Sequence, residues 1–152
     1  SISSRMITVD IRNLTTSPPD KKFVKKIVRE TLRYMEIKGT ISVGIAFVGR
    51  VRIRELNNKY NKKDAATDVL SFGSDEQFVV PKDTGEYLGE IVVCPAVVKE
   101  QSAKSHTIFA KEFAHVIIHG ILHLLGWEHE KSEKKAKEMR AKEEEIMDML
   151  GV

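Results

Sequence analysis

Hydrophobic and polar positions along this chain switch between the period of two typical of strands and the period of about 3.6 typical of helices. The apolar runs that predict strands are 6–11, 41–48, 69–72 and 87–94. The segments with helical spacing are 20–36, 51–60, 107–125 and 132–150, and Pro95 can open one more helix. This order predicts one α/β (α+β) domain over residues 1–152, with a small mixed sheet of about four strands flanked by helices.

The helix predicted at 107–125 is apolar on nearly all sides, which places it in the centre of the fold. Among its few polar positions, Lys111, His115, His119 and His123 recur every four residues and form one slowly drifting stripe. A buried helix with a single polar stripe directs that stripe at a partner. The central apolar helix is therefore the place to look for chemistry.

His119 and His123 are spaced i and i+4, so both imidazoles can point at one ion from the same face of the helix. Gly126 ends the helix, and His129 can then supply a third nitrogen from another direction. Three protein ligands leave a tetrahedral metal with one open position for water, which is typical of catalytic sites. Nitrogen-only ligation favours one zinc ion per chain, with other divalent transition metals as substitutes.

Two positions near this triad limit its interpretation. His115 lies one turn too far back to reach the same ion comfortably, so contact with a metal ligand, contact with substrate and a structural role all stay open. The spacing H-x3-H-x2-G-x2-H is shared with metzincin peptidases, in which a glutamate general base follows the first histidine. Gly120 occupies that position here, which favours hydrolysis of a bond other than the peptide bond.

Composition and charge narrow the class of protein. With 41% apolar and 31% charged residues, the chain has a soluble globular composition, and no apolar run approaches the ~20 residues of a membrane span. No secretory signal is evident, and the lone Cys94 lies in an apolar run, so we expect a buried thiol in a cytoplasmic protein. Residues 50–63, the basic segment, hold six Lys or Arg against one Glu. Such charge indicates either a nucleic-acid partner or a solvated helix face.

Three collinear blocks of sequence resemble the YbeY family of rRNA-maturation endoribonucleases. They are H-G-I-L-H-L-L-G-W-E-H at 119–129, L-N-N-K-Y-N-K-K-D-A-A-T-D-V-L-S-F at 56–72 and L-G-E-I-V-V-C-P at 88–95. The resemblance implies a metal in a cleft beside the sheet and metal-dependent cleavage of single-stranded RNA, in 16S rRNA 3′-end maturation and ribosome quality control. It carries His119, His123 and His129 onto the metal ligands of the family. It also implies pre-rRNA and the small ribosomal subunit as partners, with no membrane or DNA partner.

One position departs from the family pattern. Asn61 stands where the family usually has an arginine after the tyrosine of the second block. A neutral amide cannot neutralise a phosphate, but neighbouring lysines can act as phosphate contacts, as point charges and not as a planar fork. The predicted RNA-binding residues are Arg52, Lys59, Asn61, Lys62 and Lys63.

The general base is not assigned by the sequence. Glu128, His115 and Asp68 are all candidates, and Glu128 stands where an aspartate is common in the family. Two rival functions also remain. One is a metal-dependent hydrolase of a protein or small molecule, and the other is a non-catalytic ribosome-assembly factor that holds its metal structurally.

Overall fold

Four strands form one mixed sheet in the computed structural model, which describes residues 6–74, 86–128 and 132–152. Strands β1, β2 and β4 are parallel, and β3 runs antiparallel to β4 at the edge, in the order β1-β2-β4-β3. The strand bounds are Met6–Asn13 for β1, Thr40–Phe47 for β2, Val69–Gly73 for β3 and Glu86–Val93 for β4. The predicted small mixed sheet is confirmed.

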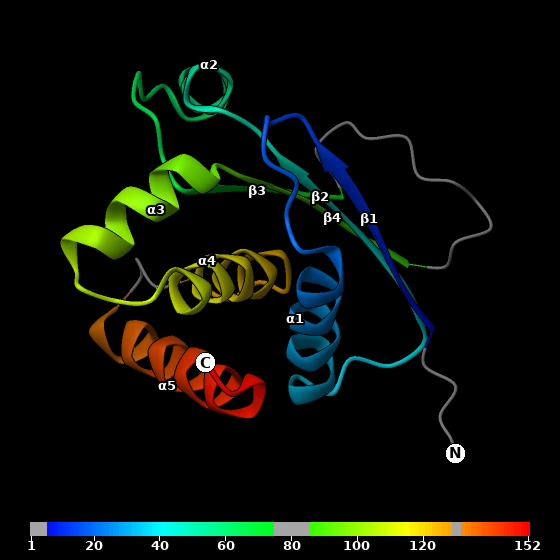
Figure 1. Cartoon of the computed structure of the whole chain (residues 1–152). Coiled ribbons are helices and arrows are strands. Elements are labelled where there is room, and N and C mark those ends of the chain that lie inside the picture. Colours follow the sequence, from blue (N-terminus) through cyan, green and yellow to red (C-terminus); the bar gives the residue numbers. More distant parts are fainter. Residues whose placement is uncertain (1–5, 75–85, 129–131) are drawn as a thin grey trace.

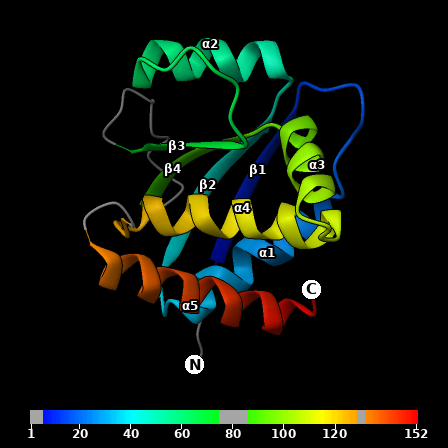
Figure 2. The same cartoon turned by 90° about the vertical axis from the view of Figure 1, so that its left-hand side faces the viewer.

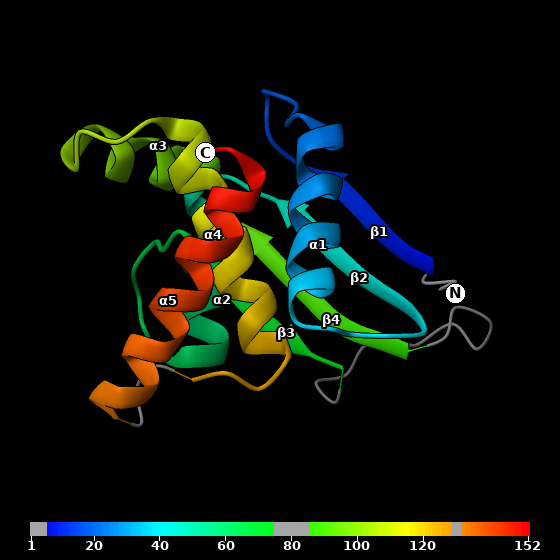
Figure 3. The same cartoon turned by 90° about the horizontal axis from the view of Figure 1, so that it is seen from below.

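Five helices connect and cover these strands within the described residues. Their bounds are Lys21–Tyr34 for α1, Arg50–Asn61 for α2, Pro95–Lys104 for α3, Phe109–Leu124 for α4 and Glu133–Leu150 for α5. Figure 3 shows α1, α4 and α5 together over one face of the sheet. Figure 1 shows α2 on the opposite side, where its core residues pack. In the described part of the chain, no helix is both long and apolar enough to cross a membrane.

Helix α4 occupies the centre of the larger core, as its apolar sequence predicts. Ile117, Ile118, Ile121 and Leu122 are all fully buried. They belong to a cluster built from α1, α4, α5 and the helix-covered face of the sheet. Figure 2 shows α4 lying between the sheet and α5, so one side of α4 meets strands and another side meets a helix.

A smaller core on the other face of the sheet holds α2 in place. Ile53 of α2 is fully buried there against Leu70, Phe72 and Val92 of the sheet. Cys94 belongs to the same cluster and is fully buried, which confirms the expected buried thiol. This packing places the end of α2 and the following loop beside β3, which is the strand nearest to the end of α4.

The ends of α1 and α5 are fixed by side-chain caps. The Asp20 carboxylate accepts a hydrogen bond from the backbone N–H of Phe23 at 3.1 Å. The Ser132 hydroxyl accepts one from the backbone N–H of Lys135 at 3.0 Å. Both caps satisfy donors that the first helical turn leaves without intrahelical partners. The Ser132 cap begins α5 at the position where the helical spacing predicted over 132–150 starts.

Gly89 allows the close pairing of β3 with β4. Its φ of +138° is disfavoured for other residues, and a Cβ atom there would lie 2.2 Å from the backbone oxygen of Phe72. Gly89 belongs to the third block of resemblance, L-G-E-I-V-V-C-P. Its physical role is to bring the two strands into the register that carries Ser71 and Ile91 beneath α4.

Candidate functional site

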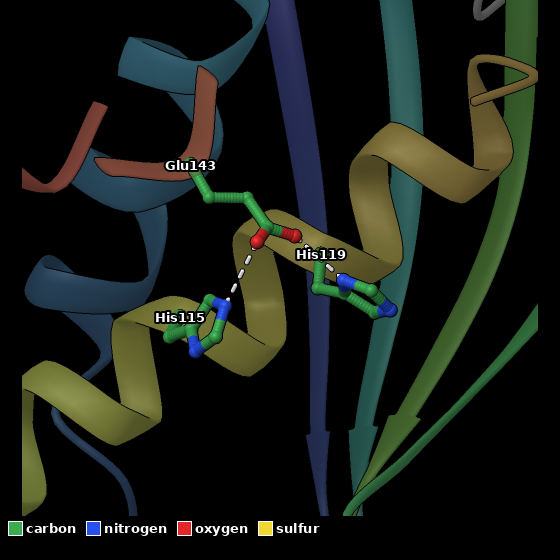
Figure 4. A group of neighbouring side chains, drawn as sticks. All are labelled: His115, His119 and Glu143. Carbon is green, nitrogen blue, oxygen red and sulfur yellow. Dashed lines mark hydrogen bonds and ion pairs between the residues drawn. The ribbon is translucent and has the colours of Figure 1, made fainter. Parts of the chain in front are cut away.

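The polar stripe of α4 turns toward α5 and meets a glutamate. Figure 4 shows His115 and His119 from α4 pointing at Glu143 from α5. His115 Nε2 lies 2.9 Å from Glu143 Oε1, and His119 Nδ1 lies 2.6 Å from Glu143 Oε2. Each carboxylate oxygen therefore accepts a hydrogen bond from a different histidine. We call His115, His119 and Glu143 the His–Glu cluster.

The second nitrogen of His119 points toward His123. The two Nε2 atoms are 2.9 Å apart, and the rings meet edge to face with an interplanar angle of 84°. Because a carboxylate only accepts, Nδ1 of His119 carries its proton and Nε2 presents its lone pair. The hydrogen-bond partners thus assign the tautomer of His119. This tautomer is the one in which His119 can bind a metal through Nε2.

Glu143 is the functional residue that the sequence reasoning missed. It is 2% exposed, and among the described residues it is the only charged side chain in the buried class. Burial alone would raise its pKa, but the hydrogen bonds from His115 and His119 outweigh burial and lower the pKa of Glu143 to about 2. A signal was present, because Glu143 shares the apolar face of α5 with Met139, Ile146 and Leu150.

His115 takes its place as a partner of Glu143. The hydrogen bond to Glu143 raises the pKa of His115, against the opposing effect of burial. Nδ1 of His115 lies 4.0 Å from the Glu112 carboxylate. The sequence leaves several roles open for His115. The geometry favours an indirect one, in which His115 contacts Glu143 and Glu143 in turn holds His119 of the predicted triad.

The His–Glu cluster also has the composition and spacing of a metal site. His115, His119 and Glu143 each offer one ligand atom, and these atoms all lie within 4.8 Å of one another. Two sets of atoms could therefore hold a metal: this cluster, or the Nε2 atoms of His119 and His123 with His129. The residues 129–131 lie outside the described part of the chain, so the His129 contribution stays a prediction.

The Nε2 pair of His119 and His123 is also close to the geometry that a metal ion needs. Two imidazole ligands of a tetrahedral zinc ion, with bonds of about 2.0–2.1 Å, have their nitrogens about 3.3 Å apart. The His119 and His123 nitrogens, at 2.9 Å, are near that separation and face a solvent-accessible cleft. The cluster nitrogens lie 2.9 and 2.6 Å from the oxygens of Glu143.

A cavity of about 770 Å³ brings α4 together with the end of the basic segment. We call this cavity the cleft. Its polar lining comes from α4, from the chain just after α4 and from the α2–β3 connection: His119, His123, Glu128, Asn57, Asn61, Lys63, Thr67, Asp68 and Ser71. Residues 60 positions apart in the sequence therefore share one polar cleft beside the edge strand β3.

Two of the five predicted RNA-binding residues line the cleft, namely Asn61 and Lys63. Arg52 lines a separate hollow of about 210 Å³, on the sheet face beneath α2. Lys59 and Lys62 are exposed and are absent from the lining of either space. The positions of these residues around α2 explain why they line different spaces. Asn57 and Asn61 share one face of the helix, whereas Arg52 and Tyr60 lie on another.

The loop after α2 is held in place by side-chain contacts. The Asn57 amide donates to the Ala65 carbonyl at 2.9 Å, and the Asn61 amide donates to the Asn57 side-chain oxygen at 3.0 Å. Lys62 ends the helix in a left-handed conformation with a φ of +59°, after which the chain reverses. Asn61 thus has a structural contact of its own, while Lys63 supplies the positive charge in the cleft lining.

The three candidates for a general base are separated by their positions. Asp68 and Glu128 both line the cleft with His119 and His123. His115 faces Glu143 instead and is not part of that lining. Asp68 and Glu128 are therefore the candidates whose carboxylates share a space with a bound substrate.

Gly120 lies where α4 approaches the sheet closely. A Cβ atom there would lie 3.1 and 3.2 Å from two side-chain carbons of Ile91 and 3.3 Å from the Ser71 hydroxyl. The backbone carbonyl of Gly120 accepts a hydrogen bond from that hydroxyl at 3.2 Å. Helix α4 thus approaches β3 and β4 closely here, and a side chain at position 120 would require Ile91 and Ser71 to shift by a few tenths of an ångström.

A buried helix that directs paired imidazoles into a polar cleft, with a carboxylate behind one of them, is typical of hydrolases that use a metal. The sequence comparisons identify the family. Residues 8–151 match the family described as Endoribonuclease YbeY, and the chain belongs to this family.

Relatives of known name and one solved structure agree with this assignment. The chain is 40% identical over 130 residues to an Endoribonuclease YbeY from Acinetobacter baylyi, covering 85% of this chain and 82% of the relative. It is 36% identical over 155 residues to an Endoribonuclease YbeY from a Roseiflexus species, covering 100% and 97%. The solution structure of TM1509 from Thermotoga maritima matches with a TM-score of 0.62 and 31% identity, over 95% of this chain and 89% of that one. Family membership supports an endoribonuclease role.

Proposed function

We propose that this protein is a metal-dependent endoribonuclease that cleaves single-stranded RNA. The observation that carries the proposal is the shared lining of the cleft, in which the paired histidines of α4 lie in one space with Lys63 and Asn61. The names of the relatives supply the reaction class. The finer role is 16S rRNA 3′-end maturation and ribosome quality control on the small ribosomal subunit, and therefore in the cytoplasm.

We assign the metal ligands to His119, His123 and His129, with one zinc ion per chain. The separation and orientation of the first two Nε2 atoms support this choice, and imidazole ligands suit zinc. When bound, the ion supplies Lewis-acid polarisation of a phosphoryl oxygen and a nucleophile at neutral pH.

Lys63 is the phosphate contact nearest to this centre. Its charge lies in the cleft lining, where it can hold the phosphate that is cleaved or the one beside it. Arg52 lines the hollow on the other side of α2, so it meets a more distant part of the RNA strand. A metal at the bottom of a cleft reaches a flexible single strand more easily than a stacked duplex, which favours single-stranded substrates.

The proton transfers fall to Asp68 or Glu128, since both carboxylates line the cleft. A general base must come within hydrogen-bond distance of the attacking oxygen, and only groups in the cleft satisfy that condition. Glu143 is excluded from this role because it is buried behind His119 and occupied by two histidines.

Cleavage assays with purified protein test this proposal. The protein is stripped with EDTA, reloaded with Zn²⁺ and incubated with labelled single-stranded RNA, the same RNA as a duplex, single-stranded DNA, or unfolded casein. We expect cleavage of the single-stranded RNA by the reloaded protein alone. Cleavage of casein with intact RNA would establish the rival hydrolase. Tight zinc binding with no cleavage of any substrate would establish the non-catalytic assembly factor.

The finer role needs a natural substrate. A pre-16S rRNA fragment with its 3′ extension should be cut in the extension, and the protein should sediment with small ribosomal subunits. Cleavage at scattered positions throughout the fragment, without such sedimentation, would contradict the maturation role while leaving the endoribonuclease role intact.

A further inference from the structure

Glu143 stands apart from every other charged residue in the described part of the chain, because it is buried and both of its oxygens are occupied by histidines. We propose that Glu143 is a positioning residue for the metal site, which holds His119 in the tautomer and orientation that present Nε2 to the ion. His115 is the anchor that fixes Glu143. This inference rests on the proposed metal site and not on the proposed RNA substrate.

The first step of the argument is the tautomer of His119. Its Nδ1 lies 2.6 Å from a carboxylate oxygen, so the proton resides on Nδ1 and the Nε2 lone pair is directed toward Nε2 of His123, 2.9 Å away. A histidine without such a partner divides its proton between both nitrogens, and only one of the two forms can bind a metal through Nε2. The carboxylate thus removes the free-energy cost of selecting this tautomer, which metal binding would otherwise carry.

The second step is the orientation of the imidazole ring. A hydrogen bond to Glu143 on one side and the contact with His123 on the other fix the His119 ring in one plane. Glu143 comes from α5, a different helix from its partner, so the contact also fixes the distance between α4 and α5 at this point. Carboxylate partners of this kind typically contribute 10–100-fold to metal affinity.

The third step is the role of His115. A carboxylate with one occupied oxygen could rotate about its terminal torsion, whereas the 2.9 Å contact with His115 occupies the other oxygen. His115 sits one helical turn before His119, so both imidazoles reach the same carboxylate from one stripe of α4. The three histidines spaced every four residues therefore have different roles. His115 anchors Glu143, His119 is the ligand that Glu143 orients, and His123 is the second ligand.

The alternative to this arrangement is a metal held by the His–Glu cluster itself. The ligand atoms of the cluster are close enough for that. In that case, His119 would bind through Nδ1, and His115 would be a metal ligand whereas His123 would not. The two arrangements thus differ in the expected effect of removing His115.

Zinc affinity without RNA tests the proposal. Glu143→Gln keeps the shape of the side chain but removes its charge and replaces one acceptor with a donor, so His115 and His119 can no longer both donate to it. We expect the dissociation constant for Zn²⁺, measured by chelator competition, to rise by about 10–100-fold. Glu144→Gln is the matched control, because it removes the same charge from an exposed position one residue away. A dissociation constant for Glu143→Gln within twofold of that control would overturn the proposal.

His115→Ala separates the two arrangements. As the loss of an anchor, it should raise the zinc dissociation constant less than Glu143→Gln does. If His115→Ala instead abolishes zinc binding while His123→Ala retains it, or if one of two bound zinc ions is lost, the cluster is itself the metal site and the positioning role is wrong.

The tautomer can be measured on the unaltered protein, which removes any concern that a variant fails to fold. Long-range ¹H–¹⁵N correlation spectra of the zinc-free protein should show His119 protonated at Nδ1. A His119 protonated at Nε2 would overturn the proposal. Neither measurement involves RNA, so a failure of the endoribonuclease proposal and a failure of this inference give different results.

Discussion

The His–Glu cluster and the basic segment are both rich in charge, but they hold that charge in opposite ways. In the cluster, a buried carboxylate is satisfied by two histidines at hydrogen-bond distance. In the basic segment, the arginines lie at the surface and pair with exposed acids, as Arg54 does with Asp64 at 2.7 Å. Exposed pairs of this kind contribute little to stability, whereas buried groups lose a great deal when a partner is removed.

This difference teaches where single residues matter. A site formed by buried, mutually satisfied groups depends on each member, and its variants should show large effects. RNA binding by a surface of exposed charges depends on the total charge, except where the fold places one charged residue in the cleft. Lys63 is that exception within the basic segment.

The largest effect should come from His123→Ala. Loss of one imidazole from a three-nitrogen site removes the metal and, with it, all RNA cleavage, while the apolar α4 still folds because its core residues are unchanged. Zinc content per chain, circular dichroism and RNA cleavage check this prediction. Lys111→Ala, an exposed change on the same stripe of α4, is the control and should retain all three. Full, EDTA-insensitive cleavage by His123→Ala would contradict the metal assignment.

Gly120→Glu should cause the next largest effect, on stability. It restores the residue that metzincin peptidases carry, but directs it against Ile91 and Ser71. Burying an unpaired carboxylate in this contact should cost about 3 kcal/mol or more of unfolding free energy. Chemical denaturation measures the loss, and a casein assay should detect no peptidase activity. A stable variant that cleaves casein would show that the packing account of Gly120 is wrong.

Lys63→Glu should weaken RNA binding at a single defined point. Removing one phosphate contact of a single strand should lower the slope of log K against log salt by about 0.7. Fluorescence anisotropy with labelled RNA at several salt concentrations measures the slope. An unchanged slope would remove Lys63 from the phosphate contacts.

Lys62→Glu and Arg52→Glu should have the smallest effects, and they sharpen the comparison. Each makes the same change of charge within the basic segment, but Lys62 is not part of the cleft lining and Arg52 lines the separate hollow. Cleavage of a short RNA should therefore fall less in either variant than in Lys63→Glu. Equal losses in all three variants would indicate that total charge, and not the position of Lys63, determines RNA binding.

The sequence could predict features that depend on short-range spacing. The i, i+4 pair His119 and His123 lies on one rigid helix, so its convergence follows from helix geometry alone. The four strands and the helix that begins after Ser132 follow from equally local patterns. These features are confirmed because nothing outside the element is needed to specify them.

The sequence could not predict features that depend on how elements meet. Glu143 lies on α5, and its partners lie on α4, 24 and 28 positions earlier in the chain. Its place on the apolar face of α5 gave a signal, but the partner could be identified only from packing. Likewise, the direction of each cation in the basic segment depends on how α2 sits on the sheet, which the number of charges does not reveal.

X-ray absorption at the zinc edge of the reloaded protein tests the central claim most directly. The account predicts a first shell of three imidazole nitrogens and one further light ligand from solvent, with a spectrum that Glu144→Gln leaves unchanged and His123→Ala abolishes. A shell of four protein ligands would contradict an open catalytic position. A shell that contains a carboxylate and is lost in His115→Ala would show that the His–Glu cluster holds the metal.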